Sequence, residues 1–185
     1  QLIPRDVVAL SGGGAVFIGE LNYYLDVMVH YSFFIRVDGS GQPVVAKILG
    51  RDTGPDGFAH RWNHIIRTQD GAFVLTGESE GTMPTGSIPL MKLDADANEI
   101  WGKRLSADAN GAPYQRSMPN GLVEDTNGDL VVFTNVQANG DPSYQWMIRT
   151  DASGDPIATY RYEMPWAGYS ACATSDGGYV VGGSS

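Results

Sequence analysis

The residues that come closest to a metal-binding motif are Asp94, Asp96 and Asn98, whose alternating spacing is that of the start of an EF-hand calcium loop. Such a loop also needs a glycine at its sixth position and a glutamate at its twelfth. The chain has Glu99 and Leu105 there. We therefore interpret the segment as a polar turn and predict no metal site, and these three residues are the first candidates for a weak surface cation.

The next candidates are two histidines and one thiol. His60 and His64 are four residues apart, a spacing that keeps one face of a helix or a strand, but no third ligand is apparent and a zinc site is not predicted. Cys172 is the only cysteine, so the chain cannot form an intrachain disulfide or a four-cysteine zinc site. With no base or electropositive setting nearby in sequence, we predict a buried, inert thiol.

Motifs for catalysis and for cofactors are missing from the sequence. Gly12-Gly13-Gly14 is not followed by Lys-Ser/Thr, so it is not a phosphate loop. No His-Glu-x-x-His or Gly-x-Ser-x-Gly motif occurs. The carboxylates number 21 and lie mostly in predicted turns, so an acid pair for glycoside hydrolysis cannot be assigned without geometry. We predict no catalytic residue and no cofactor.

Aromatic residues give the more promising candidates for binding. The segment from Asn22 to Tyr31 looks like an insertion, and it contains Tyr23, Tyr24 and Tyr31. An insertion confined to one repeat often lies on a binding face, so these three tyrosines are our candidate contact residues, with local packing as the alternative.

The elements that would position these residues follow from an internal repeat. Asp70-Gly71-Ala72-Phe73-Val74 returns as Asn127-Gly128-Asp129-Leu130-Val131 and as Asp176-Gly177-Gly178-Tyr179-Val180, with a fainter copy from Gly12 to Gly19. The glycine steps from 13 to 71, 128 and 177 are 58, 57 and 49 residues. A second motif ends at Asp38, Asp94 and Asp151, in steps of 56 and 57. A period near fifty is typical of stacked or radial repeat proteins.

Each repeat reads as four short strands joined by turns. Asx-Gly pairs are strong hairpin signals, and apolar, β-branched and aromatic residues fill the runs between them. We predict an all-β protein made of four-stranded antiparallel meanders, with hairpins turning at Asp70-Gly71, Asn127-Gly128 and Asp176-Gly177. The predicted strands lie near 7–10, 15–20, 33–37, 44–49, 64–68, 72–77, 89–93, 99–105, 120–124, 129–135, 145–150, 156–162, 169–174 and 178–183.

A lone sheet of this kind buries too little apolar surface, so the sheets must pack face to face. Matching positions should then be buried alike: Val16, Val74, Val131 and Val180 form one set, and Ile35, Met91 and Ile148 form another. The repeat positions of Trp101 and Trp146 favour packing between sheets.

The turn motif Asp176-Gly177-Gly178-Tyr179, its following glycines, and Lys92-Leu93-Asp94 before an aromatic strand resemble a β-propeller repeat of bacterial secreted and cell-surface proteins. The resemblance spans nearly the whole chain and implies a β-propeller. Residues 1–185 would be one propeller module with blades at about 5–58, 59–115 and 116–166 and a partial blade at 167–185. In the first copy Gly12 replaces the turn aspartate.

This count gives about three and a half blades, which is fewer than a closed propeller needs. The open edge and apolar face would invite pairing. Either the chain belongs to a longer polypeptide that supplies the remaining blades, or a second chain covers the open side. We favour the first, because the repeat breaks off in mid-blade without a capping segment.

Composition and charge limit the kinds of partner that we expect the chain to bind. The net charge is −9 and no basic stripe is present, so we do not expect nucleic acid to bind. No apolar run is long enough to span a bilayer, so membrane insertion is not expected. The resemblance implies a secreted, periplasmic or cell-surface location.

The expected function is a non-enzymatic propeller module that contacts protein or carbohydrate, or serves as a structural subunit of a surface assembly. The alternative is a propeller glycoside hydrolase or lyase with acidic residues at the central channel. Inward-facing Asp, Glu, Arg and Tyr side chains would favour the enzyme, and a channel lined by small and apolar residues would favour the module.

Overall fold

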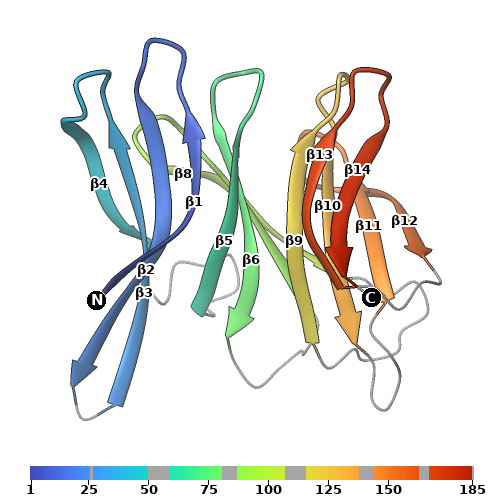
Figure 1. Ribbon diagram of the computed structural model, residues 1–185, viewed down its shortest axis with the longest axis horizontal. Helices are drawn as coiled ribbons and strands as arrows, with labels where there is room; N and C mark the ends of the chain where they lie inside the picture. Colours follow the sequence, from blue (N-terminus) through green and yellow to red (C-terminus); the bar gives the residue numbers. More distant parts are fainter. Residues whose placement is uncertain are drawn as a thin grey trace.

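The computed structural model describes residues 1–25, 27–49, 59–80, 87–106, 116–137, 144–162 and 167–184, which contain strands and no helix (Figure 1). All fourteen strands predicted from the sequence are present. They are β1 (Leu2–Ala9), β2 (Ala15–Leu25), β3 (Val27–Val37), β4 (Pro43–Leu49), β5 (Ala59–Arg67), β6 (Phe73–Glu80), β7 (Ser87–Leu93), β8 (Glu99–Ser106), β9 (Arg116–Glu124), β10 (Leu130–Gln137), β11 (Tyr144–Thr150), β12 (Pro156–Tyr162), β13 (Ala167–Ala173) and β14 (Tyr179–Ser184).

The strands form three meanders and a hairpin. Sheet 1 has the order β1-β2-β3-β4, sheet 2 has β5-β6-β7-β8, and sheet 3 has β9-β10-β11-β12. The fourth unit is the β13–β14 hairpin. Every neighbouring pair is antiparallel, as the sequence predicts.

The units stand in a row with their first strands side by side. β1 contacts β5, β5 contacts β9, and β9 contacts β13 (Figure 1). A core lies at each junction. The first contains Val16, Ile18 and Phe34 of sheet 1 with Phe73 and Leu75 of sheet 2. Similar cores join sheet 2 to sheet 3 and sheet 3 to the hairpin. Within the described residues the row does not close into a ring (Figure 1).

The row gives each sheet a forward face, toward the next unit, and a backward face, toward the previous one. Val16, Val74 and Val131 are fully buried on forward faces, as predicted, but Val180 is 55% exposed. The prediction of equal burial is therefore wrong at Val180, because no described unit follows the hairpin. In the second set Met91 and Ile148 are buried and Ile35 is only half-buried. Ile35 lies on the backward face of sheet 1, which no described unit precedes.

The same reasoning corrects the expectation for the thiol. Cys172 on β13 pairs with Val180 on β14, and its side chain is exposed rather than buried. It shares the uncovered forward face of the hairpin, so the prediction of burial is wrong.

One turn geometry joins the strands within all four units. In each of seven hairpins the backbone N–H of the first turn residue donates to the carbonyl of the fifth, and the N–H of the fourth donates to the carbonyl of the first. The fourth residue has positive φ in each turn: Gly13, Gly41, Gly71, Ala97, Gly128, Gly154 and Gly177. This is a three-residue hairpin loop with a G1 bulge. The turns at Asp70-Gly71, Asn127-Gly128 and Asp176-Gly177 are thus confirmed.

The outermost strand of one sheet holds the last turn of the next. Lys47 Nζ on β4 donates to Asn98 Oδ1 at 2.6 Å, and Lys103 Nζ on β8 donates to Asp155 Oδ1 at 2.7 Å. Beside the second of these contacts, Gly154 lies against the indole of Trp101. Trp101 and the buried Trp146 both join the core between sheets 2 and 3, which confirms their predicted packing between sheets.

Candidate binding site on the first strands

A β-bulge occurs at the same place on the first strand of every unit. The pairing register shifts between Pro4 and Asp6 on β1, between Trp62 and His64 on β5, between Pro119 and Gly121 on β9, and between Gly168 and Ser170 on β13. The extra residues are Arg5, Asn63, Asn120 and Tyr169, whose steps of 58, 57 and 49 residues equal those of the turn glycines. Bulges re-aim side chains and are frequent beside functional sites.

Three of the bulge residues are polar and bond to polar partners on the same sheet. Arg5 Nε donates to Glu20 Oε1 at 2.9 Å, and a second guanidinium nitrogen lies 2.6 Å from the same oxygen. Asn63 Nδ2 donates to Glu78 Oε1 at 3.4 Å. In sheet 3, Asn120 Nδ2 donates to Gln145 Oε1 at 3.3 Å. The side chain of Tyr169 lies outside the described part of the structure.

Two of the partners also follow the repeat, since Glu20 on β2 and Glu78 on β6 are 58 residues apart. The position 57 residues later is Asn135 on β10, but the partner of Asn120 is Gln145 on β11. Glu20 and Asn135 are buried, whereas Glu78 is half-buried. From sheet 1 to sheet 3 the bulge pair changes from an ion pair to an amide–carboxylate pair and then to an amide–amide pair. The number of charges therefore falls along the row.

The residues that follow the bulges link one unit to the next. Asp6 Oδ2 accepts the backbone N–H of Ile65 at 3.0 Å and lies 3.8 Å from His64 Nδ1. His64 in turn hydrogen-bonds the backbone carbonyl of Pro119. Burial lowers the pKa of His64 below its usual value, and the charge of Asp6 opposes this only in part. His64 is therefore an uncharged bridge between strands β1, β5 and β9 at neutral pH.

We name Arg5, Glu20, Asn63, Glu78, Asn120 and Gln145 the polar row. Its groups are one guanidinium, two carboxylates and three amides, which together donate and accept hydrogen bonds in fixed positions. Arg5 keeps 39% of its side chain exposed and Asn63 is half-buried, so sheets 1 and 2 present the solvent-accessible part of the row. This arrangement is suited to holding a ligand rich in hydroxyl or amide groups.

The residues that the sequence singles out for calcium form a structural turn. Asp94 Oδ1 accepts the backbone N–H groups of Asp96 and Asn98, both at 2.8 Å, and Asp94 Oδ2 accepts Asn98 Nδ2 at 2.8 Å. Asn98 Oδ1 is bound by Lys47. The oxygen atoms of Asp94 and Asn98 that could have bound a cation therefore accept hydrogen bonds from the turn itself and from Lys47 of sheet 1. Among the described residues no group of three or more His, Cys, Asp or Glu side chains could hold a metal ion.

Of the other sequence-predicted residues, His64 is engaged with Asp6. The side chains of His60, Tyr23 and Tyr24 lie outside the described part of the structure. The segment from Asn22 to Tyr31 is not a loop insertion, because its described residues lengthen β2 and β3 in one ladder. Tyr23 pairs there with Val29, and Tyr31, which is half-buried, pairs with Leu21.

Sequence reasoning missed all six members of the polar row. A signal was available, since Arg5, Asn63 and Asn120 keep the period of the turn glycines, and Glu20 and Glu78 keep it too. Polar residues at a constant place inside apolar strands are unusual, because burying them requires partners. The register shift that turns them toward one another is visible only in the strand pairing.

Comparisons with known proteins describe the fold. No protein-family model matches the chain, and no curated protein matches it. Among solved structures, a protein of unknown function from Dyadobacter fermentans matches with a TM-score of 0.61 and 13% identity, over 92% of this chain and 53% of its own. One from Bacteroides caccae, also of unknown function, matches with a TM-score of 0.51 and 11% identity, over 80% and 46%.

The chain spans about half the length of these two solved structures. At such low identity the likeness defines the class of fold alone, an all-β protein with four-stranded antiparallel sheets. The described residues contain no helix long and apolar enough to cross a membrane.

Proposed function

We propose that the chain is a set of β-propeller blades that works as a non-enzymatic binding module of a secreted, periplasmic or cell-surface protein. The polar row is its contact surface, and a carbohydrate is the ligand that we favour. The observation that carries this proposal is the bulge repeated on every first strand, which puts a polar residue at the equivalent position of three adjoining strands. In a propeller the first strands of the blades surround the central channel, where ligands are held.

The state of the acids supports binding over catalysis. Glu20 is buried and held by Arg5, and Asp6 accepts the Ile65 amide and faces His64. A general acid or nucleophile would need to reach a substrate. Because the carboxylates of Glu20 and Asp6 are already bound to other residues of this chain, they fit a rigid recognition surface better than a catalytic role.

One observation favours the enzymatic alternative. Glu20 and Glu78 occupy equivalent positions on neighbouring sheets, and Glu20 is bound by the Arg5 guanidinium. A propeller glycoside hydrolase or lyase would use such a pair of acids if they face the central channel. Glu78 is the half-buried member and would be the group to reach a substrate.

A glycan array tests the proposal. The purified chain and its Asn63→Ala/Glu78→Gln variant would be applied to immobilised neutral and acidic oligosaccharides, with a substitution of the exposed Glu99 on β8, Glu99→Gln, as the matched control. We expect selective binding that the double variant loses and the control keeps, with unchanged β-sheet circular dichroism for all three. Absence of binding, or equal binding by the double variant, would contradict the proposal.

The array ligand also separates binding from catalysis. Incubating it with the chain and following reducing ends and unsaturated products should give no reaction. Turnover that Glu78→Gln abolishes would favour the enzyme instead.

We also propose that a further sheet of the same kind is the partner of the uncovered faces. The backward face of sheet 1 exposes Leu2, Val7 and Ile48, and its counterparts in sheets 2 and 3 are covered by the preceding sheet. The covering sheet would come from other blades of a longer polypeptide or from a second chain. We expect the 185 residues alone to self-associate in light scattering. A monomer with one sharp unfolding transition would argue against this partner.

A further inference from the structure

Each sheet has a cation at the same place on its third strand. Arg36, Lys92 and Arg149 are 56 and 57 residues apart. In sheets 2 and 3 the first turn of the same sheet supplies carboxylates to this cation. Lys92 Nζ lies 2.7 Å from Asp70 Oδ2.

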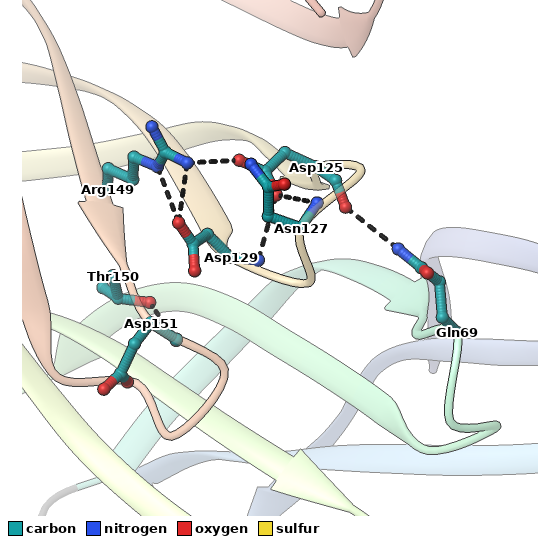
Figure 2. A network of polar contacts seen from close by, with 7 residues as sticks. All are labelled: Gln69, Asp125, Asn127, Asp129, Arg149, Thr150 and Asp151. Atoms are coloured by element: carbon teal, nitrogen blue, oxygen red, sulfur yellow. Dashed lines mark hydrogen bonds and ion pairs between the residues drawn. The ribbon is translucent and has the colours of Figure 1, made fainter.

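In sheet 3 the clamp is more extensive. Arg149 Nε donates to Asp129 Oδ2 at 2.9 Å, and Nη2 lies 2.7 Å from that oxygen and 2.8 Å from Asp125 Oδ2 (Figure 2). Charge-assisted contacts of this kind are the strong class of hydrogen bond. The chain therefore contains its own template for how a carboxylate binds the third-strand cation.

Sheet 1 has the cation without the carboxylates. The positions of Asp125, Asn127 and Asp129 in the turn of sheet 3 correspond to Leu10, Gly12 and Gly14 in sheet 1. A hollow of about 290 Å³ lies at this place. Its lining contains all three of these residues together with Arg36, Ser11, Val37, Asp38, Gly39 and Val44.

The cation at this hollow is held in place by sheet 2. Arg36 Nη1 donates to the Ala95 carbonyl at 2.7 Å, and Nη2 lies 3.5 Å from Asp96. The Asp96 side chain is 71% exposed, so this ion pair is weak and can yield to a better-placed anion. A second guanidinium bonds a residue of the lining, since Arg67 Nη1 donates to Ser11 Oγ at 3.1 Å.

Asp38 also lines the hollow, and its negative charge opposes an anion. Its Oδ1 accepts the backbone N–H groups of Ser40 and Gln42 and the Ser40 hydroxyl, and these bonds lower its pKa. Its counterpart Asp151 follows Arg149 by two residues, and its Oδ1 likewise accepts backbone N–H groups of its own turn. The template therefore binds its carboxylates despite an aspartate at this position.

We propose that the hollow beside Arg36 binds a carboxylate group of a ligand, which takes the place of the carboxylates that the first turn of sheet 1 lacks. The site lies at the turn end of sheet 1 and does not depend on the function proposed for the polar row. The shared chemistry is a carboxylate, which an acidic peptide side chain or a uronic acid can supply.

The probes are small carboxylates with uncharged partners of the same shape. N-acetyl-aspartate amide would be compared with N-acetyl-asparagine amide, and glucuronate with glucose. The readout is ¹H–¹⁵N NMR of the full chain, followed at the Gly12 and Gly14 amides and at Arg36 Nε–H. We expect both carboxylates to shift these signals in a saturable way and both uncharged partners to leave them in place. If only one of the two carboxylates binds, that result shows whether the ligand is an acidic peptide or a uronic acid.

Two kinds of variant test the role of Arg36 and the role of the carboxylate that the first turn of sheet 1 lacks. Arg36→Gln should weaken carboxylate binding by roughly tenfold or more, since it removes a charge-assisted hydrogen bond. Gly12→Asp would supply a carboxylate at the position of Asp70 and should block the site. Gly12→Asn has the same backbone strain at φ +107° without the charge and should still bind.

The proposal is overturned if the uncharged probes shift the same signals as strongly as the carboxylates, or if no probe shifts them. It is also overturned if Arg36→Gln binds as the wild type does, or if Gly12→Asp and Gly12→Asn bind equally. The two glycine variants keep the test valid should Arg36→Gln fail to fold.

Discussion

The indole of Trp101 on β8 fills the space that a side chain at Gly154 would need, since a Cβ built on Gly154 would lie 2.9 Å from the ring. Gly154 also has φ +81°, where L side chains are strained. This contact joins the outermost strand of sheet 2 to the last turn of sheet 3. In the preceding junction Val45 and Ala97 occupy the two positions, and Ala97 is buried with φ 58°.

Gly154→Ala should therefore destabilise the protein more than Gly41→Ala does. Gly41 has nearly the same φ, +82°, but a Cβ there would meet nothing within 4 Å. We expect about 1–2 kcal/mol for Gly41→Ala from the backbone conformation alone, and about 1–3 kcal/mol more for Gly154→Ala from overpacking. Urea unfolding measures both.

Adding Trp101→Val to Gly154→Ala copies the Val45–Ala97 pair and should recover part of the loss. Equal costs for the two glycine variants would contradict the junction described here.

His64 should make the protein less stable as the solution becomes acidic. Its pKa is lowered in the folded protein, mainly by burial, from an unfolded value near 6.5. Below that pH the unfolded chain binds more protons than the folded protein, so stability is present above about pH 6.5 and is lost as pH falls toward the folded pKa.

The measurement is urea unfolding of wild type and His64→Gln between about pH 5 and 8, where ordinary carboxylates remain ionised. The difference in unfolding free energy between the two should shrink as pH falls. A difference that stays constant across this range would show that His64 does not titrate as the structure requires.

Asp70→Asn should weaken sheet 2 because it leaves the ammonium of Lys92, an almost buried side chain, without its carboxylate. Since the Asp70 side chain is largely exposed, solvent screening limits the expected loss to about 1 kcal/mol. Hydrogen bonds from Lys92 first, and then from the Thr68 hydroxyl and the Ala72 amide, lower the pKa of Asp70 from 3.8 to about 2. The pair's contribution is therefore fully present above pH 3.8 and is lost as pH falls through 2.

Asp176→Asn is the matched control, because Asp176 follows a threonine in the same turn geometry but is bonded by Thr174 and Gly178 rather than by a cation. In thermal unfolding at neutral pH, the midpoint temperature of Asp70→Asn should be lower than that of Asp176→Asn. The opposite order would mean that the turn, not the ion pair, sets the effect of Asp70.

The repeat made most of the fold predictable. Glycine at the fourth position of a turn, such as Gly71 or Gly128, fixes a hairpin locally, and the apolar runs between turns form strands wherever they find partners. The burial of individual side chains was harder to predict, because it depends on whether another sheet of the row covers the face on which they lie. Val131 and Val180 look alike in sequence, and only one of them is covered.

The polar row was beyond local reasoning for a related reason. A bulge residue such as Asn63 differs from its neighbours only by a one-residue slip in pairing, and that slip is a property of two strands together. The turn from Asp94 to Asn98 was predictable, since Glu99 and Leu105 stand where a calcium loop needs glycine and glutamate, and the structure has the predicted polar turn.

Each unit of the row covers the forward face of the unit before it, and Val131→Ala compared with Val180→Ala tests this stacking most directly. Chemical denaturation of the two variants should show a loss of about 1–3 kcal/mol for Val131→Ala, whose side chain is fully buried between sheet 3 and the hairpin. Val180→Ala should be close to neutral. Equal losses, or a neutral Val131→Ala, would contradict the stacking of the sheets.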